Sequence, residues 1–284
     1  EEEGVLRRGA ANEWNVVTAL PKGDGSTECR RLLDAYPDYR AELTLLSRCG
    51  GRLAEVLQGS QDPLQLLFPE GDPAALEGLY RDSPSARVFN RIVQSAVADL
   101  TKHQEAGRGL RVLEIGAGTA STTQYVLPVL PPETEYVFTD ISPLFVARAA
   151  ERFSSRAGMQ FVVFDVDDKA PLEQGLTPGS FDLIIAANVL HATRDLRRTM
   201  SRVRELLRPG GVLVLLEGTR ALRWVDLTFG MTEGWWRFTD RELRPQHALL
   251  APAQWRTLLG SSGFDQTAAA PENGGAAGQT GLRA

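Results

Sequence analysis

Two residues that could take part in proton transfer follow consecutive apolar runs of this sequence. His191 lies just after the run 181–187 (FDLIIAA), and Glu217 directly follows the run 212–216 (VLVLL). A carboxylate bonded to one imidazole nitrogen fixes the tautomer and leaves the other nitrogen able to accept a proton. If the two runs form neighbouring strands, these side chains meet at one sheet edge as a general base and its orienting group. A histidine that only caps the following helix is the alternative interpretation.

A glycine-rich turn follows an earlier apolar run, 110–115 (LRVLEI). It contains Glu114, Gly116, Gly118 and Thr119, and such a turn between a strand and a helix lets the backbone approach a ligand closely. A dinucleotide-binding turn would read GxGxxG and hold a pyrophosphate at the helix N-terminus. Here the spacing differs, and the Glu114 carboxylate would repel a pyrophosphate but suits a ligand with an amine and a sulfonium group. A purely structural turn is the alternative.

Further candidate binding residues stand where the next strands are expected to end, which is where ligands bind in parallel sheets. Asp140 could accept hydrogen bonds from both hydroxyls of a ribose, and Ile141 beside it is assigned to the same site. Asp165 could accept from an adenine amino group, with the Val166 amide as a donor, although a solvated acidic turn is the alternative. Asn188 follows the fourth strand, near the expected position of the transferred group.

The pattern of the chain indicates how these residues are positioned. Short apolar runs alternate with segments of helical periodicity, which predicts an α/β fold with a parallel sheet covered on both faces. The expected strands are 110–115, 135–139, 159–164, 181–187 and 212–216, and the expected helices are 119–130, 142–153 and 196–207. We expect this core to span residues 106–268, after a mostly helical lid (1–105) and before a flexible, Gly-rich tail (269–284).

Composition excludes several classes of protein. The 284 residues are 43% hydrophobic and 24% charged, which suits a large globular domain. The formal net charge of −5 argues against nucleic-acid and anionic membrane partners. No run is long enough to cross a membrane and no signal-peptide core appears, so a cytoplasmic location is expected. Cys29 and Cys49 lack metal-binding spacing, so free thiols and no metal are expected. The ragged ends suggest a piece of a longer chain.

The segments VLEIGAGT, YVFTDIS, FDLIIAANVLHAT, LLRPGG and FGMTEGWWRFTD together resemble methyltransferase domains of modular polyketide synthases. The resemblance covers about residues 40–264. It implies a Rossmann-like class I methyltransferase sheet of seven strands with an N-terminal lid. It also implies S-adenosylmethionine as cofactor, S-adenosylhomocysteine as product, and His191 with Glu217 as base and orienter. One departure is Ala120-Ser121, where the family often has Gly-Gly.

The resemblance leaves two reactions open on an acyl chain held by the phosphopantetheine arm of an acyl carrier protein. The methyl acceptor is either a β-hydroxyl oxygen or the α-carbon of a β-ketoacyl thioester. Carbon-methylating relatives usually carry a longer lid, so the roughly hundred residues before the sheet favour oxygen. Other domains of the same megasynthase are further expected partners. A nicotinamide-dependent oxidoreductase and an inactive spacer are the alternatives from other classes.

Four residues are assigned to the substrate pocket. Tyr80 falls in the lid, Asn90 lies on the helix that follows, and Trp235 and Trp236 stand side by side after the last strand. Core packing is the alternative for the two tryptophans. Of the remaining histidines, His103 and His247 are expected at the surface, and a place at the substrate entrance is the alternative for His247.

Overall fold

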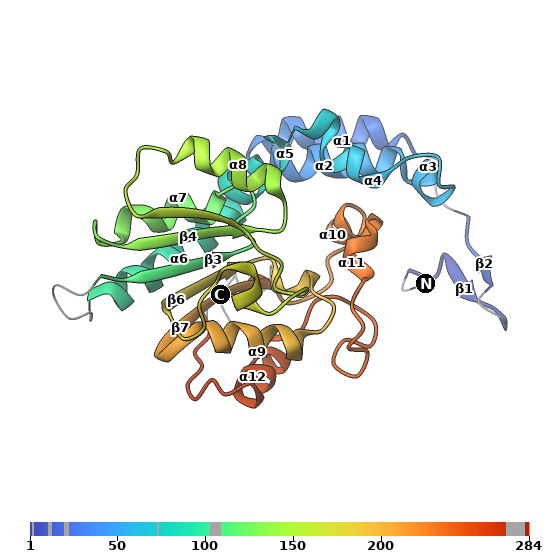
Figure 1. Cartoon of the computed structure of the whole chain (residues 1–284). Coiled ribbons are helices and arrows are strands. Elements are labelled where there is room, and N and C mark those ends of the chain that lie inside the picture. The colour runs from blue at the N-terminus through green and yellow to red at the C-terminus, as the bar shows by residue number, and fades with distance from the viewer. Residues whose placement is uncertain are drawn as a thin grey trace.

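A six-stranded sheet forms the centre of the protein (Figure 1). The computed structural model describes residues 1, 3–10, 13–19, 23–72, 74–102, 109–270 and 282–283. The strand order is β5-β4-β3-β6-β7-β8. These strands are β3 (Arg111–Ile115), β4 (Glu135–Asp140), β5 (Met159–Val163), β6 (Phe181–Ala187), β7 (Leu207–Gly218) and β8 (Leu282–Arg283). All neighbours pair in parallel except β8, which runs antiparallel to β7.

The parallel sheet predicted from the apolar runs is therefore confirmed, with the strands within a few residues of the expected positions. The expected number of seven strands is not matched. The described residues supply six strands to this sheet, because residues 219–270 form helices and loops but no strand.

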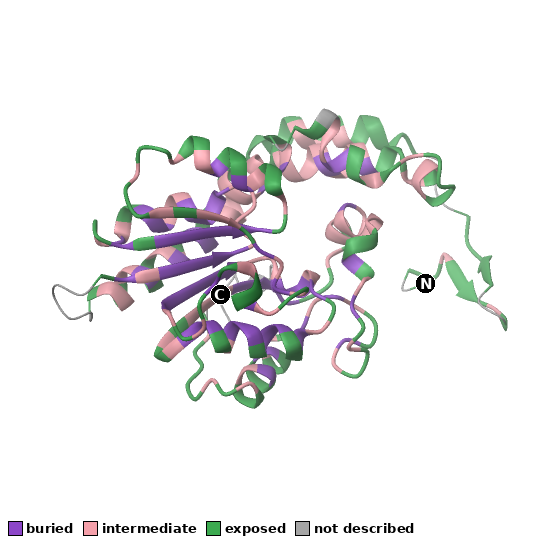
Figure 2. Cartoon of the chain, in the orientation of Figure 1, coloured by how far each residue is buried: buried purple, intermediate pink, exposed green. Residues whose placement is uncertain are grey.

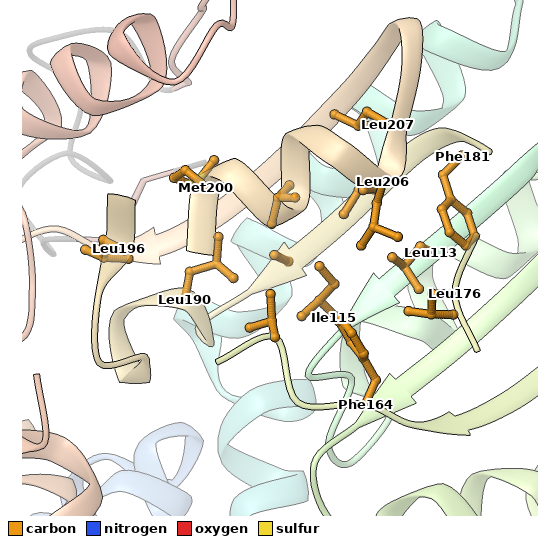
Figure 3. Packing of buried hydrophobic residues seen from close by; sticks show 14 of the residues in the cluster. Leu113, Ile115, Phe164, Leu176, Phe181, Leu190, Leu196, Met200, Leu206 and Leu207 are labelled. Carbon is orange, nitrogen blue, oxygen red and sulfur yellow. The ribbon is translucent and has the colours of Figure 1, made fainter. Parts of the chain in front are cut away.

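Helices cover both faces of this sheet (Figure 1). One face carries α6 (Pro84–Lys102), α7 (Ser121–Val126) and α8 (Pro143–Arg152), and the other carries α9 (Leu196–Leu206) and α12 (Pro252–Ser261). Successive strand residues point to opposite faces, so Leu113 and Ile115 join the α9 layer while Val112 joins the α6 layer. Figure 3 shows the buried apolar residues of the α9 layer, where Met200 and Leu206 of α9 pack over the sheet. Figure 2 shows that the strands are largely buried, as a sheet covered on both sides requires.

The N-terminal helices form a layer of their own over one edge of the sheet (Figure 1). They are α1 (Gly25–Ala35), α2 (Arg40–Gly51), α3 (Leu53–Leu57), α4 (Pro63–Leu67) and α5 (Ala74–Glu77). Their apolar side chains cluster around Leu45 and Leu67, and we call this layer, residues 25–82, the lid. Helix α6 lies within the segment expected as lid, but its apolar face of Phe89, Val93 and Val97 packs on the sheet instead.

The remaining segments are short. Strands β1 (Leu6–Arg8) and β2 (Trp14–Val16) form an exposed antiparallel hairpin. Helices α10 (Arg223–Asp226) and α11 (Glu233–Trp236) follow β7, and Trp224 packs against the lid. His103 and most of the expected tail lie outside the described residues. Both cysteines are free thiols. Within the described ranges, no helix has the length and apolar character needed to span a bilayer.

Candidate active site

A cavity of about 490 Å³ lies at the carboxyl ends of the parallel strands, beneath the lid. Its walls come from the loops after β3, β4, β6 and β7, from the lid, and from the segment of α10 and α11. Strands β3 and β6 are neighbours in the sheet but not in the chain, so the cavity stands where the strand order reverses. Ligands of doubly wound sheets bind at this point.

The glycine turn after β3 forms one wall, and its two glycines allow a close approach of the backbone. Gly116 has φ +62°, and a Cβ there would lie 2.2 Å from Cγ2 of Val189 in the loop after β6. Gly118 also has a positive φ, and its N–H donates to Oδ2 of Asp140 at 2.9 Å. Ala120, the departure from the family pattern, keeps the left-handed conformation with φ 61°. Only a turn of this kind lets the loops after β3 and β6 meet so closely.

Glu114 is a buried carboxylate with one oxygen engaged, and none of the described residues forms a hydrogen bond with the other. The hydroxyls of Thr123 and Tyr136 both donate to its Oε2 at 2.6 Å. Burial raises the pKa of Glu114 to about 7 despite these two hydrogen bonds. Glu114 lines the cavity, so the second oxygen can receive a cationic donor such as an amine.

Asp140 ends β4 and also lines the cavity. Its Oδ1 accepts from the N–H of Ser142 at 2.8 Å, and its Oδ2 accepts from Gly118. Burial raises the pKa of Asp140 above its ordinary range. Ser142 is the N-cap residue of α8, as expected, but its side chain makes no capping bond, and its own N–H donates to Asp140. The carboxylate therefore joins the glycine turn to the start of α8.

The other residues assigned to the cofactor divide into two groups. Thr119 and Asn188 line the cavity, and Asn188 has the unusual φ of 52°. Ile141, Asp165 and Val166 are not among the lining residues. Asp165 accepts the N–H of Asp167 at 2.8 Å, as the acidic-turn alternative predicts, and Val166 is buried in the α9 layer. Ile141 is exposed next to Asp140.

His191 and Glu217 meet as the strand-end argument predicted. The Nδ1 atom of His191 lies 2.6 Å from Oε2 of Glu217. The other oxygen, Oε1, accepts the backbone N–H groups of Val189 at 3.1 Å and Leu190 at 2.7 Å. A carboxylate can only accept, so Nδ1 carries the proton and Nε2 keeps its lone pair. His191 lines the cavity, so a base with a defined tautomer faces the reaction space.

A buried arginine that sequence reasoning missed holds the His191 loop in place. Arg244 is 1% exposed and pairs through Nε with Oδ1 of Asp240 at 2.7 Å. Its Nη1 donates to the carbonyl of His191 at 2.7 Å, and its Nη2 donates to the carbonyl of Thr193 at 2.8 Å. No sequence signal marks it, because an arginine in the polar segment RELRP is ordinarily exposed.

The residues assigned to the substrate pocket have different positions. Tyr80 lines the cavity from a π-helical turn of the lid, and burial raises the pKa of its hydroxyl. Asn90 also lines it, but its amide is engaged: Nδ2 donates to the Tyr80 carbonyl and Oδ1 accepts from Thr122, both at 2.9 Å. Trp235 is 8% exposed and its ring lies 5.1 Å from that of His191. Trp236 is 41% exposed, does not line the cavity, and donates to the Gly230 carbonyl at 2.7 Å.

Two further features were not expected from sequence. His247, expected at the surface, is half-buried between Trp235 and Trp236, and its Nε2 lies 2.9 Å from Oδ1 of Asp226.

The cavity also has an apolar portion, built mainly by lid residues and by the segment after β7. Its members include Leu67, Phe68, Phe89, Val225, Phe229 and Leu249. Apolar residues in a lid have no motif, so only their general helical spacing could have suggested them.

Comparisons with known proteins agree with this geometry. The family model described as a methyltransferase domain matches residues 113–213. The non-reducing polyketide synthase mapC of Penicillium roqueforti is 38% identical over 259 residues, which is 88% of this chain and 10% of that protein. The non-reducing polyketide synthase dpmpA of Macrophomina phaseolina is 43% identical over 262 residues, 88% of this chain and 12% of that protein. The chain thus spans about a tenth of the length of these curated relatives.

Solved structures give a match over nearly the whole chain. The CurJ carbon methyltransferase is 45% identical with a TM-score of 0.93, covering 99% of this chain and 75% of that one. The CMeT domain of the citrinin polyketide synthase is 31% identical with a TM-score of 0.86, covering 99% and 74%. The DszA carbon methyltransferase is 30% identical with a TM-score of 0.85, covering 95% and 70%.

The fold and the cavity define a class I S-adenosylmethionine-dependent methyltransferase. The residues fit that cofactor, since the turn around Gly116 and Gly118, the carboxylate of Glu114 and the carboxylate of Asp140 converge on one wall. More particularly, the chain belongs to the methyltransferase domains of polyketide synthases. The nicotinamide-dependent alternative is thereby excluded.

Proposed function

We propose that this chain methylates the α-carbon of a β-ketoacyl thioester held by an acyl carrier protein. The observation that carries this proposal is the His191–Glu217 pair in the cavity wall, with Nε2 of His191 free to accept a proton. The similar solved structures support carbon as the acceptor, since CurJ and DszA are described as carbon methyltransferases. The sequence-based preference for a hydroxyl oxygen rested on lid length alone, and these comparisons favour the alternative.

The residues of this chain supply the proton transfer that carbon methylation needs. The α-hydrogen between two carbonyl groups is acidic, and Nε2 of His191 takes it as the Cα–H electron pair forms an enolate. Glu217 holds the imidazole in position and stabilises the imidazolium that results. S-adenosylmethionine supplies the electrophilic methyl group: the Cα–CH₃ bond forms as the S–CH₃ bond breaks, and that electron pair stays on sulfur. The apolar walls exclude water, which would otherwise return the proton.

We assign the cofactor contacts to the wall formed by β3, β4 and β6. Glu114 and Asn188 receive the amino-acid end, and Asp140 accepts the ribose hydroxyls. Ile141 would contact the adenine, with Asp165 accepting from its amino group and the Val166 amide donating to the ring. Gly116, Gly118 and Thr119 complete this wall, and Tyr80 and Trp235 face the substrate. Asn90 acts indirectly, because its amide ties the lid carbonyl of Tyr80 to α7.

Other domains of the same synthase and its carrier protein are the partners of this chain in our proposal. The relatives support it, because they are polyketide synthases of which this chain spans only a tenth. We also propose a division into a lid, a methyltransferase core up to about residue 268, and a tail. In this division we place the lid–core boundary at Ser83, and the packing of α6 on the sheet supports counting that helix with the core.

Intact-mass spectrometry of loaded carrier proteins tests the reaction. A carrier protein loaded with either a β-ketoacyl or a β-hydroxyacyl chain is incubated with the domain and S-adenosylmethionine. We expect one methyl gain on the ketoacyl form only, with fragmentation placing it on the α-carbon. A gain only on the hydroxyacyl form would establish oxygen methylation, and no gain on either would support an inactive spacer.

The raised pKa of Glu114 predicts how cofactor binding depends on pH. Its pKa moves from an ordinary 4.5 to about 7, so the folded chain keeps a proton there that the unfolded chain releases between these values. Stability therefore falls as the pH rises from about 5 to 7. A cationic ligand favours the ionised carboxylate, so affinity for S-adenosylmethionine should rise across the same range. Glu114→Gln should flatten both profiles in calorimetry and thermal melts.

The matched control is Glu135→Gln, which removes a half-exposed carboxylate from the adjacent strand. It should leave both profiles unchanged. Equal pH dependence in the Glu114 variant and the unaltered chain would remove Glu114 from the cofactor site.

Asp140→Ala should weaken cofactor binding by about 10- to 100-fold, since charge-assisted hydrogen bonds contribute about 1.5–3 kcal/mol. Isothermal titration with S-adenosylhomocysteine measures this. Asp140 also serves the start of α8, so Asp195→Ala is the control: Asp195 caps α9 by accepting the N–H groups of Arg197 and Arg198. That variant should lose about 1 kcal/mol of stability and no affinity. Unchanged affinity in the Asp140 variant would contradict its ribose role.

A further inference from the structure

The cavity opens to the surface beside two lining residues. Among the lining residues of the part that the structure describes, only Leu64 and Arg220 are exposed. Leu64 belongs to α4 of the lid, and Arg220 stands in the loop directly after β7. Arg220 is three residues beyond Glu217, a span of at most about 10 Å. Because Arg220 both lines the cavity and is exposed, we take it to mark the rim on the side of the His191–Glu217 pair.

Arg220 is also the one lining residue with a permanent positive charge among those described. It forms no hydrogen bond or ion pair with any described residue. Arg223, three positions later, differs in this respect because it pairs with Glu3. The charges deeper in the cavity are the carboxylates of Glu114 and Asp140, which lie on the β3–β4 side. The rim therefore offers an unpaired cation on the opposite, β7 side.

We propose that Arg220 binds the phosphodiester of the phosphopantetheine arm as the acyl chain enters the cavity. The proposal rests on the proposed function, since it requires a carrier-bound thioester substrate. Such a substrate has an uncharged arm and acyl chain and one anionic group, the phosphodiester. A guanidinium matches phosphate oxygens with two parallel N–H donors. Arg220 would hold this anion at the rim while the thioester reaches His191 through the apolar portion of the cavity.

The carboxylate of the cofactor is the other anion that Arg220 could meet. We favour the phosphodiester because β6 separates β7 from β3, the strand that carries the glycine turn. Arg220 is also exposed, as a contact for an arm that leads out to a carrier protein should be.

The proposal is tested with two thioesters that differ only in whether they carry the phosphate group. The same β-ketoacyl group is attached to phosphopantetheine and to pantetheine, and kcat/KM is measured from S-adenosylhomocysteine release. We expect the unaltered chain to prefer the phosphorylated thioester about five- to tenfold, since the contact is exposed. This preference should shrink as ionic strength rises. Arg220→Ala should abolish this preference by lowering kcat/KM for the phosphorylated thioester alone. Arg220→Lys should keep part of the preference.

The control variant is Arg256→Ala, which removes an exposed arginine from α12, on the sheet face opposite α6. It should keep the full preference, and Arg220→Ala should keep its kcat and its affinity for S-adenosylhomocysteine. No preference in the unaltered chain, or equal losses on both thioesters, would overturn the proposal. A loss of S-adenosylhomocysteine affinity would move Arg220 to the cofactor carboxylate. Methylation of neither thioester by the unaltered chain would contradict the proposed function and this contact with it.

Discussion

Replacing His191 with alanine should lower kcat by about a thousandfold while leaving the affinity for S-adenosylhomocysteine unchanged. General-base catalysis contributes about 10²–10⁴ in rate, and the Nε2 atom of His191 is the base that faces the cavity. The loop should keep its shape, because Oε1 of Glu217 still accepts the N–H of Leu190 at 2.7 Å. Single-turnover kinetics with a loaded carrier protein measure the rate. Weakened cofactor binding with normal turnover at saturation would contradict the assignment.

Glu217→Gln separates the orienting role from the basic one. The amide nitrogen of the new side chain would face Nδ1 of His191 as a donor, so the imidazole proton would move to Nε2. The nitrogen facing the cavity would then be unable to accept a proton, and turnover should fall nearly as far as in His191→Ala. Because both variants disable one unit, the double variant should lose little more than either single variant. Additive losses would show that the two residues act independently.

Replacing Arg244 with methionine should lower the free energy of unfolding by about 3–5 kcal/mol, because it leaves a buried charge without its partner. The carboxylate that loses its ion-pair partner is that of Asp240, whose side chain is 3% exposed. The carbonyls of His191 and Thr193 lose their donors in the same substitution. Urea denaturation followed by far-UV circular dichroism measures the loss. Turnover should fall as well, since the loop that carries His191 loses its anchor.

Two companion variants test the physical reason for that loss. Asp240→Asn in the Arg244→Met background removes the unpaired charge and should recover part of the stability. Arg256→Met, at an exposed position of α12, should change stability by no more than about 0.5 kcal/mol. A loss in Arg244→Met as small as in Arg256→Met would show that the buried network does not hold the loop.

The two halves of the cavity differ in how they are made rigid. In our assignment, the cofactor side is built from the loops after β3 and β4, where short hydrogen bonds hold Glu114 and Asp140. The substrate side depends on side chains from the lid and from α10 and α11. Hydrogen bonds such as those of Asn90 to Tyr80 and Thr122 connect the lid to α7, which packs on the sheet.

The amino-acid sequence alone determined the parallel sheet, the glycine turn and the meeting of His191 with Glu217. Each depends on local order: apolar runs mark strands, and residues that end parallel strands converge at one edge of the sheet. The positive φ of Gly116 follows from the same turn. Residue spacing was enough to predict the strands and the turn, whereas the meeting of His191 with Glu217 also required β6 and β7 to be neighbours, as the structure shows.

The tertiary structure decided what depends on contacts between distant segments. Arg244 bonds to the carbonyl of a residue 53 positions away, and no motif announces such a contact. Asn90, assigned to the substrate pocket from sequence, lines the cavity, and only the structure shows that its amide is bonded to Tyr80 and Thr122. Trp235 and its neighbour are identical in type, yet the packing of α11 buries only the former. Burial and pairing are set by the whole assembly of elements, which local spacing does not encode.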